Sequence, residues 1–245
     1  MKFNVDQTVR EIAIENPSSV RIFESLGIDY CCGGKRSLQD ACQRANVPLD
    51  KVLQLLFTAD DQPPEAMGNW TGASILDLTQ HIVEQHHGYV RRESPQLVSM
   101  LVKVVARHGA EHQELKPIQE LFVAMSDELY MHMMKEENVL FPYLAKMEAA
   151  ASESRPAPPA MFGSVEVPII RMLADHEDAG ALTSRIRALS GGYRLPEEAC
   201  PTWRALYKGL EEFERDLHQH VHLENNILFP RALEMERKES AYVHS

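Results

Sequence analysis

The chain has 245 residues, of which 44% are hydrophobic, so it is long enough to bury a core without disulfide bonds. Its formal charge of −11, from 25 basic and 36 acidic side chains, argues against general binding to nucleic acid or an anionic membrane, because both need clustered Lys and Arg. No signal-peptide core and no apolar run of about 18 residues occurs. We therefore expect a soluble cytoplasmic protein without nucleic-acid or membrane partners.

Helical signals dominate from the start of the chain. In "NPSSVRIFESLG", Asn16 is suited to cap a helix, Pro17 to open it and Gly27 to end it. Apolar residues recurring three and four apart predict two further short helices, over residues 38–46 and 49–58. The first part of the chain is thus predicted to be a small helical domain.

Two breaks divide the rest of the chain. The stretch "ADDQPPEAMGNW" predicts a linker from about Asp60 to Asn69, and "AASESRPAPPAMFGS" is a second interruption. The prediction is an all-α protein with an N-terminal domain over 1–62 and a larger helical domain over 70–240. The larger domain contains two internal repeats, about 70–150 and 165–240.

The repeats share an eleven-residue motif, "HMMKEENVLFP" from His132 and "HVHLENNILFP" from His220. The two His are 88 positions apart, and so are Glu136 and Glu224. One repeat before His176, the same offset falls at position 88, beside a pair of His. Each repeat therefore offers a His on an earlier helix and His-x-x-x-Glu on a later one.

The His pair is His86 and His87, and helix phase cannot choose between them because the apolar stripe reaches both. The repeat favours His87, which lies 89 positions before His176. His108 and His112 are also four apart, but their polar, glycine-containing surroundings are more typical of an exposed helix end or loop than of a metal site.

The helix phase of both motifs predicts that the His and the Glu face the core, since they continue stripes of apolar residues. A single His and Glu at this spacing is most often a surface pair. Two buried carboxylates placed close together repel one another unless a cation lies between them. Four imidazoles and two carboxylates without thiolate favour iron over the sulfur-rich structural zinc sites.

We expect His87 and His132 to bind one iron and His176 and His220 the other, with Glu136 and Glu224 bridging. An oxo or hydroxo bridge would give each metal five ligands and leave a sixth position open.

The motifs resemble those of a known family. His-x-x-x-Glu-Glu/Asn-x-x-Leu-Phe-Pro in both repeats is similar to the hemerythrin-like (HHE) four-helix bundles. Together with "DYCCGGKRSL" at residues 29–38, which resembles an ScdA-type N-terminal domain, it resembles the Repair of Iron Centres family, di-iron proteins that restore iron–sulfur clusters after nitrosative or oxidative damage.

The resemblance implies an antiparallel hemerythrin-like bundle that holds two non-haem iron ions with an oxo or hydroxo bridge. The family's iron ligands correspond to the same six residues: His87, His132, Glu136, His176, His220 and Glu224. Oxygen-carrying hemerythrins have a further His four residues after the third-helix ligand, where this chain has Gly180. Simple oxygen carriage is therefore disfavoured.

The chain has four cysteines, too few and too unevenly placed for a secreted disulfide framework, so free thiols are expected. Cys31 and Cys32 lie before Gly33 and Gly34 and the basic "KR" pair, which we expect to lower the thiol pKa values. An arbitrary pair of this kind is more often packing than chemistry. The resemblance implies a role in passing iron or nitric oxide to or from the metal centre.

Three functions are consistent with the sequence. The favoured one is cluster repair by donation of labile iron to damaged iron–sulfur proteins. The second is reduction or detoxification of nitric oxide or peroxide, so whether the protein is an enzyme stays open. The third is a sensor that binds oxygen or nitric oxide without turnover. The protein could also pair with a second copy of itself as a homodimer.

Overall fold

The computed structural model describes residues 3–60 and 70–243 of the chain. These residues form helices and turns, with two isolated bridges and no named strand, as the all-α prediction requires. By its internal contacts the chain divides into two compact units, Met1–Ser74 with Val221–Arg231, and Ile75–His220 with Ala232–Ser245. None of the described helices is both long and apolar enough to span a membrane.

Four short helices build the N-terminal part of the first unit: α1 (Val9–Glu15), α2 (Ser19–Leu26), α3 (Leu38–Arg44) and α4 (Leu49–Asp60). Helix α1 opens with a capping box, in which Thr8 accepts the Glu11 N–H and Glu11 accepts the Thr8 N–H. The inner faces of these short helices bury side chains such as Val9, Phe23 and Leu38. The predicted linker around residues 61–69 lies outside the described residues.

Helix α2 begins later than the sequence suggested. Asn16 is the C-cap of α1, donating its N–H to the Ile12 carbonyl, and residues 16–18 form the turn between the helices. The assignment of Asn16 and Pro17 as the start of the helix was therefore wrong, because α1 extends to Glu15 and leaves only this short connection. Gly27 ends α2 in the left-handed conformation (φ 64°), as predicted.

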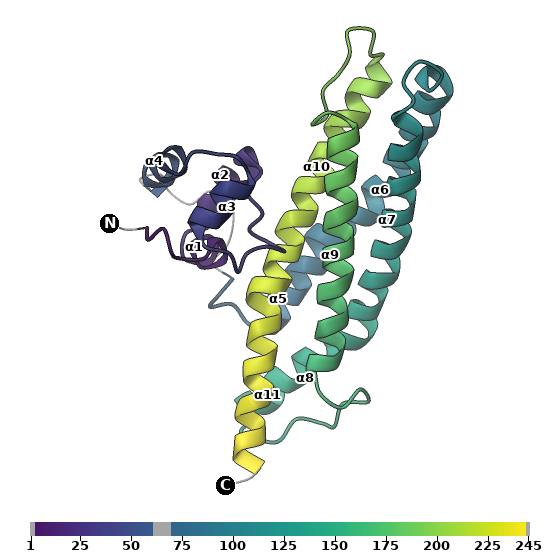
Figure 1. Cartoon of the computed structure of the whole chain (residues 1–245). Helices are drawn as coiled ribbons and strands as arrows, with labels where there is room; N and C mark the ends of the chain where they lie inside the picture. Colours follow the sequence, from purple (N-terminus) through teal and green to yellow (C-terminus); the bar gives the residue numbers. More distant parts are fainter. Residues whose placement is uncertain (1–2, 61–69, 244–245) are drawn as a thin grey trace. The chain divides into compact units, whose positions relative to one another are not determined.

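The second unit contains the long helices of the bundle apart from the segment Val221–Arg231. Figure 1 shows α6 (Gly88–His108), α7 (Leu115–Lys135), α9 (Glu166–Leu189) and α10 (Pro201–Leu223) running side by side. Ring contacts of Phe213 in α10 with Phe122 in α7 (5.2 Å between centroids) and with Tyr89 in α6 (6.0 Å) confirm this packing. Helix α5 (Ile75–His81) precedes α6, α8 (Phe141–Ser152) follows α7 and α11 (Phe229–Val243) follows α10, so three of the four long helices are extended into longer helical rods.

A π-helical segment joins each of those extensions to its rod: η1 (Ile82–His87), η2 (Glu136–Leu140) and η3 (Glu224–Leu228). At the end of η2, the Phe141 N–H bonds the Glu136 carbonyl five residues back, and Phe229 bonds Glu224 in the same way. The next residue is Pro142 in one copy and Pro230 in the other. Proline has no N–H and would strike the carbonyl four residues earlier in an α-helix, so the wider turn accommodates it.

Candidate metal centre

Six side chains from four rods of the bundle form the candidate centre. His87 ends η1, His132 lies near the end of α7, His176 lies in the middle of α9 and His220 lies near the end of α10, while Glu136 and Glu224 open η2 and η3. Each of the six is 2% exposed or less. Carboxylates are almost never buried to this degree without a counter-charge, so the arrangement calls for cations.

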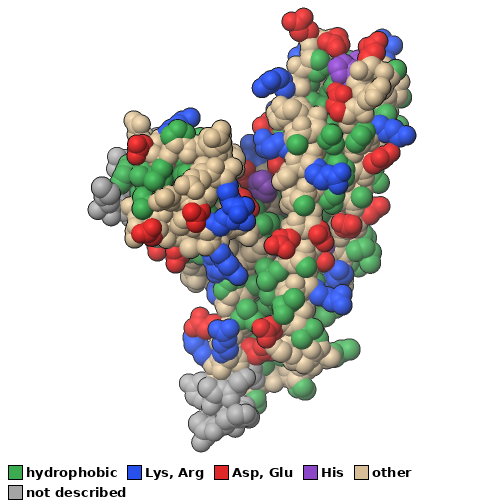
Figure 2. Space-filling view, in the orientation of Figure 1, with side chains coloured by type: hydrophobic (Ala, Val, Ile, Leu, Met, Phe, Trp, Pro, Cys, Tyr) green, Lys and Arg blue, Asp and Glu red, His purple; other side chains and the backbone are tan. Residues whose placement is uncertain are grey.

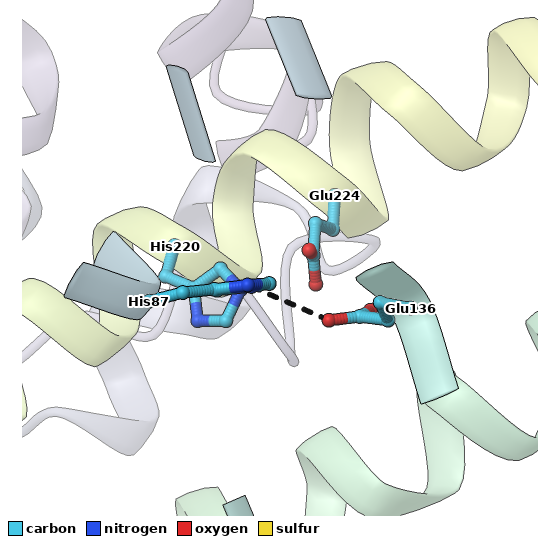
Figure 3. A group of neighbouring side chains, drawn as sticks. All are labelled: His87, Glu136, His220 and Glu224. Carbon is cyan, nitrogen blue, oxygen red and sulfur yellow. Dashed lines mark hydrogen bonds and ion pairs between the residues drawn. The ribbon is translucent and has the colours of Figure 1, made fainter. Parts of the chain in front are cut away.

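The six residues make two overlapping groups that could each hold a metal ion. One contains His87 and His220, the other His132 and His176, and both include Glu136 and Glu224. Within each group the ligand atoms lie within 4.8 Å of one another. Figure 3 shows the first group, with its side chains turned toward a common space.

This pairing corrects the sequence expectation, which joined His87 to His132 and His176 to His220. The Nε2 atoms of His87 and His220 are 3.2 Å apart, and those of His132 and His176 are 3.0 Å apart. Each group thus takes one His from each repeat. The repeat pattern located the residues but contained no information on which imidazoles face one another inside the bundle.

Glu136 spans the two groups. Its Oε1 lies 3.1 Å from His132 Nε2, and its Oε2 lies 3.4 Å from His87 Nε2. A carboxylate that turns one oxygen toward each imidazole pair has the layout of a bridging ligand. With nitrogen and carboxylate donors and no thiolate, the set fits iron or another first-row transition metal.

Carboxylates outside the groups bind the outer nitrogens of two imidazoles. Glu137 Oε1 lies 2.6 Å from His87 Nδ1 and accepts a hydrogen bond from Arg91 at 2.7 Å. Asp175 Oδ2 lies 3.1 Å from His132 Nδ1 and accepts a hydrogen bond from Lys135, also at 3.1 Å. Such partners fix the tautomer and orientation of a metal-binding imidazole and raise its basicity.

Burial opposes the charged form of Asp175, but the hydrogen bonds from His132 and Lys135 outweigh it, so the pKa of this carboxyl lies below its ordinary value. Sequence reasoning missed both outer carboxylates. One repeat away, Glu137 corresponds to Asn225 and Asp175 to His86, so the duplication gave no signal for either. Their positions directly beside Glu136 and His176 were the only clue.

The structure places His86 outside both metal groups. Its Nδ1 lies 3.0 Å from Asp216 Oδ1, and its ring stacks on that of His220 with centroids 5.7 Å apart and an angle of 8°. His81 makes an edge contact with the His86 ring. His86 therefore packs against the centre from outside, and His81 packs against His86.

His108 and His112 lie at the other end of α6 and pack around Trp203, with centroid distances of 5.0 and 4.7 Å. His112 also lies 3.0 Å from Glu114 and 3.0 Å from Glu198. The two His are half-buried rather than exposed. Neither belongs to a metal group among the described residues.

A third group, Asp29 with Cys31 and Cys32, lies in the N-terminal domain. The two sulfur atoms are 3.8 Å apart, and the Asp29 carboxylate accepts hydrogen bonds from the Cys32 and Gly33 N–H groups. Gly34 is required by packing, because a Cβ there would lie 2.5 Å from the Tyr30 carbonyl oxygen.

The environment of Cys31 contradicts the expected effect of the basic neighbours on this thiol. Its hydrogen bond to Cys32, its burial and the nearby Asp29 charge hold the pKa of Cys31 well above its ordinary value. Arg36 lies 3.7 Å from Asp29 and so faces the carboxylate rather than the thiols. Cys31 is therefore a protonated thiol in the absence of a metal or another partner.

The comparisons with known proteins agree with this architecture. Residues 5–60 match ScdA_N, a domain of unknown function (DUF542), and residues 78–232 match the hemerythrin HHE cation binding domain. The iron–sulfur cluster repair proteins YtfE of Pectobacterium atrosepticum and Pectobacterium carotovorum are each 36% identical to this chain over 228 residues, covering 93% of it and 97% of each relative. The YtfE protein of Salmonella paratyphi B is 34% identical over the same length and shares. The chain therefore belongs to the YtfE family of iron–sulfur cluster repair proteins, in which an ScdA_N domain precedes a hemerythrin-like cation-binding domain.

Proposed function

We propose that this protein repairs iron–sulfur clusters damaged by nitrosative or oxidative stress, and that it does so by giving up iron from its buried centre to the damaged client. The names of its relatives support the repair role. The observation that carries the iron-donor mechanism is the pair of overlapping His₂Glu₂ groups that share Glu136 and Glu224.

In this proposal the bundle of residues 70–240 holds two non-haem iron ions with an oxo or hydroxo bridge. Each ion would take two imidazoles, His87 with His220 or His132 with His176, and share the two carboxylates. When bound, the iron would supply the exchangeable metal. The chain excludes water through the burial of all six side chains, and Glu137 and Asp175 hold the protons on the outer imidazole nitrogens.

The paired thiols of the N-terminal domain, here taken as residues 1–62, would handle iron or nitric oxide passing between the centre and the client. Their grouping with Asp29 supports a transient metal contact. Since Cys31 is held protonated, we propose that it binds only when a metal or another electrophile displaces the proton. Damaged iron–sulfur proteins would be the clients, and nitric oxide or oxygen the small ligands.

The test uses protein loaded with isotopically labelled iron and a hydrolyase whose iron–sulfur cluster has been damaged with nitric oxide. We expect the label to appear in the repaired cluster as activity returns, without sustained consumption of nitric oxide. A Glu136→Ala, Glu224→Ala double variant is the control. Reactivation without transfer of label, or continuous nitric oxide turnover, would contradict iron donation.

A further inference from the structure

The two imidazole groups differ in what covers them on the outside. The repeat relates His132 to His220 and Glu128 to Asp216 at an offset of 88, and His86 to Asp175 at an offset of 89. At His220, the covering residue is an imidazole: the His86 ring stacks on His220 and its Nδ1 is 3.0 Å from Asp216. The side chain of His86 is 7% exposed and covers the outer face of the His220 ring.

At His132, the corresponding covering residue is Asp175, whose side chain is 36% exposed. A cavity of about 420 Å³ lies between α7 and α9 at this place, and buried His132 is part of its lining. Four carboxylates line it, those of Asp127, Glu128, Asp175 and Asp178, against the single ammonium of Lys135. Beside His220, the two related positions hold His86 and Asp216, which pair with each other. Beside His132, the same positions hold two acids, Asp175 and Glu128, and both line the cavity.

We propose that this acidic cavity is the route by which iron enters and leaves the centre, so that the iron held by His132 and His176 exchanges before the iron held by His87 and His220. A cleft lined by carboxylates concentrates cations and speeds their association. Asp175 is a positioning residue in this scheme, because it reaches the metal position only through His132 Nδ1. The inference rests on the proposed iron centre but does not require donation to a client.

The first test measures ferrous iron uptake by the metal-free full-length protein under anaerobic conditions. In the Glu128→Lys, Asp178→Lys variant, we expect uptake of the first iron to slow by about tenfold at low salt, with the difference closing at high salt. The control, Glu111→Lys with Glu120→Lys, makes the same charge change at exposed positions outside the cavity lining. Equal slowing in the control, or unchanged uptake in the cavity variant, would overturn the route.

The second test exchanges the two covers. Asp175→His places beside His132 the residue type that covers His220. His86→Asp makes the reverse change, placing beside His220 the residue type that contacts His132. Release of iron to a ferrous chelator should show a fast and a slow phase in the wild type. We expect Asp175→His to slow the fast phase and His86→Asp to quicken the slow phase, with two irons still bound at the start. Release in a single phase, or the same change in both variants, would refute the asymmetry.

The positioning role of Asp175 is tested separately. Asp175→Asn should quicken the fast phase of iron release by about 10- to 100-fold and shift the Mössbauer signal of one iron. Asp175→Glu should return both properties toward those of the wild type. Glu137→Gln, the matched change on the His87 side, should act on the slow phase. If Asp175→Asn moves both phases alike, Asp175 has only a general structural role. Because these measurements use a chelator, they remain decisive even if the repair assay shows no donation.

Discussion

Side chains that could hold a metal ion occur in two very different settings in this molecule. In the bundle, six of them lie on the helices, are buried from water and form two overlapping groups. In the N-terminal domain, Asp29, Cys31 and Cys32 lie in a short turn, with Cys31 buried but Asp29 exposed. The six buried side chains of the bundle form a preformed set of candidate ligands, whereas the turn holds the pKa of Cys31 above its ordinary value through the Cys32 hydrogen bond and burial. The difference suggests storage in one place and transient contact in the other.

The largest expected effect comes from removing a shared carboxylate. Glu136→Ala or Glu224→Ala should deplete both metal positions together, because each Glu belongs to both groups. Metal analysis of the purified variants measures this, with the folded state checked by circular dichroism. Clean loss of one iron with the other tightly kept would break the idea of a shared, bridged centre.

Next comes the choice between the adjacent imidazoles. His87→Ala should disturb the iron spectrum strongly, since His87 belongs to a metal group, while His86→Ala should leave the static spectrum nearly intact. Absorption spectra of the two iron-loaded variants provide the comparison. The opposite ranking would place His86 at the metal and shift the first helix by one residue.

A smaller effect is expected at the thiols. Asp29→Asn removes a negative charge that raises the pKa of Cys31 while leaving an oxygen to accept the backbone N–H groups. The lower pKa would raise the thiolate fraction, and with it the alkylation rate, several-fold at a pH below the thiol pKa. Alkylation of Cys31 by iodoacetamide, followed by peptide mass spectrometry, is the measurement. Asp40→Asn, an exposed acid on α3, is the control and should leave the rate unchanged.

The smallest effect on iron binding is expected from replacing both Cys31 and Cys32 by Ser. The bundle should keep its iron, because no cysteine belongs to either of its metal groups. Reactivation of a nitric-oxide-damaged iron–sulfur enzyme should nevertheless slow several-fold under identical reductant. Equal reactivation rates would assign the thiols to packing alone and remove the functional contrast between the two settings.

The sequence led to the candidate metal ligands of the bundle because duplication marks them. The offset of 88 selected His132 with His220 and Glu136 with Glu224, and the structure brings these residues together with His87 and His176. The imidazole pairing was wrong because periodicity identifies the inward face of a helix but not which inward side chains face one another across the bundle.

Features that the repeats do not share were also missed. The outer carboxylates Glu137 and Asp175 have no acidic counterpart one repeat away, so nothing in the duplication pointed to them. The π-helical turns η2 and η3 had a signal in the prolines that follow Phe141 and Phe229, which a search for α-helical phase does not use. At Cys31, the basic neighbours suggested a lowered pKa, but only the three-dimensional arrangement shows that Arg36 faces Asp29 instead.

The most direct test of the central claim is the iron content and Mössbauer spectrum of the full-length protein after anaerobic loading and oxidation. Two His₂Glu₂ groups that share both carboxylates predict two irons per chain, magnetically coupled to one another. Binding of a single iron, or of two irons without coupling, would contradict a centre in which Glu136 and Glu224 join the two positions.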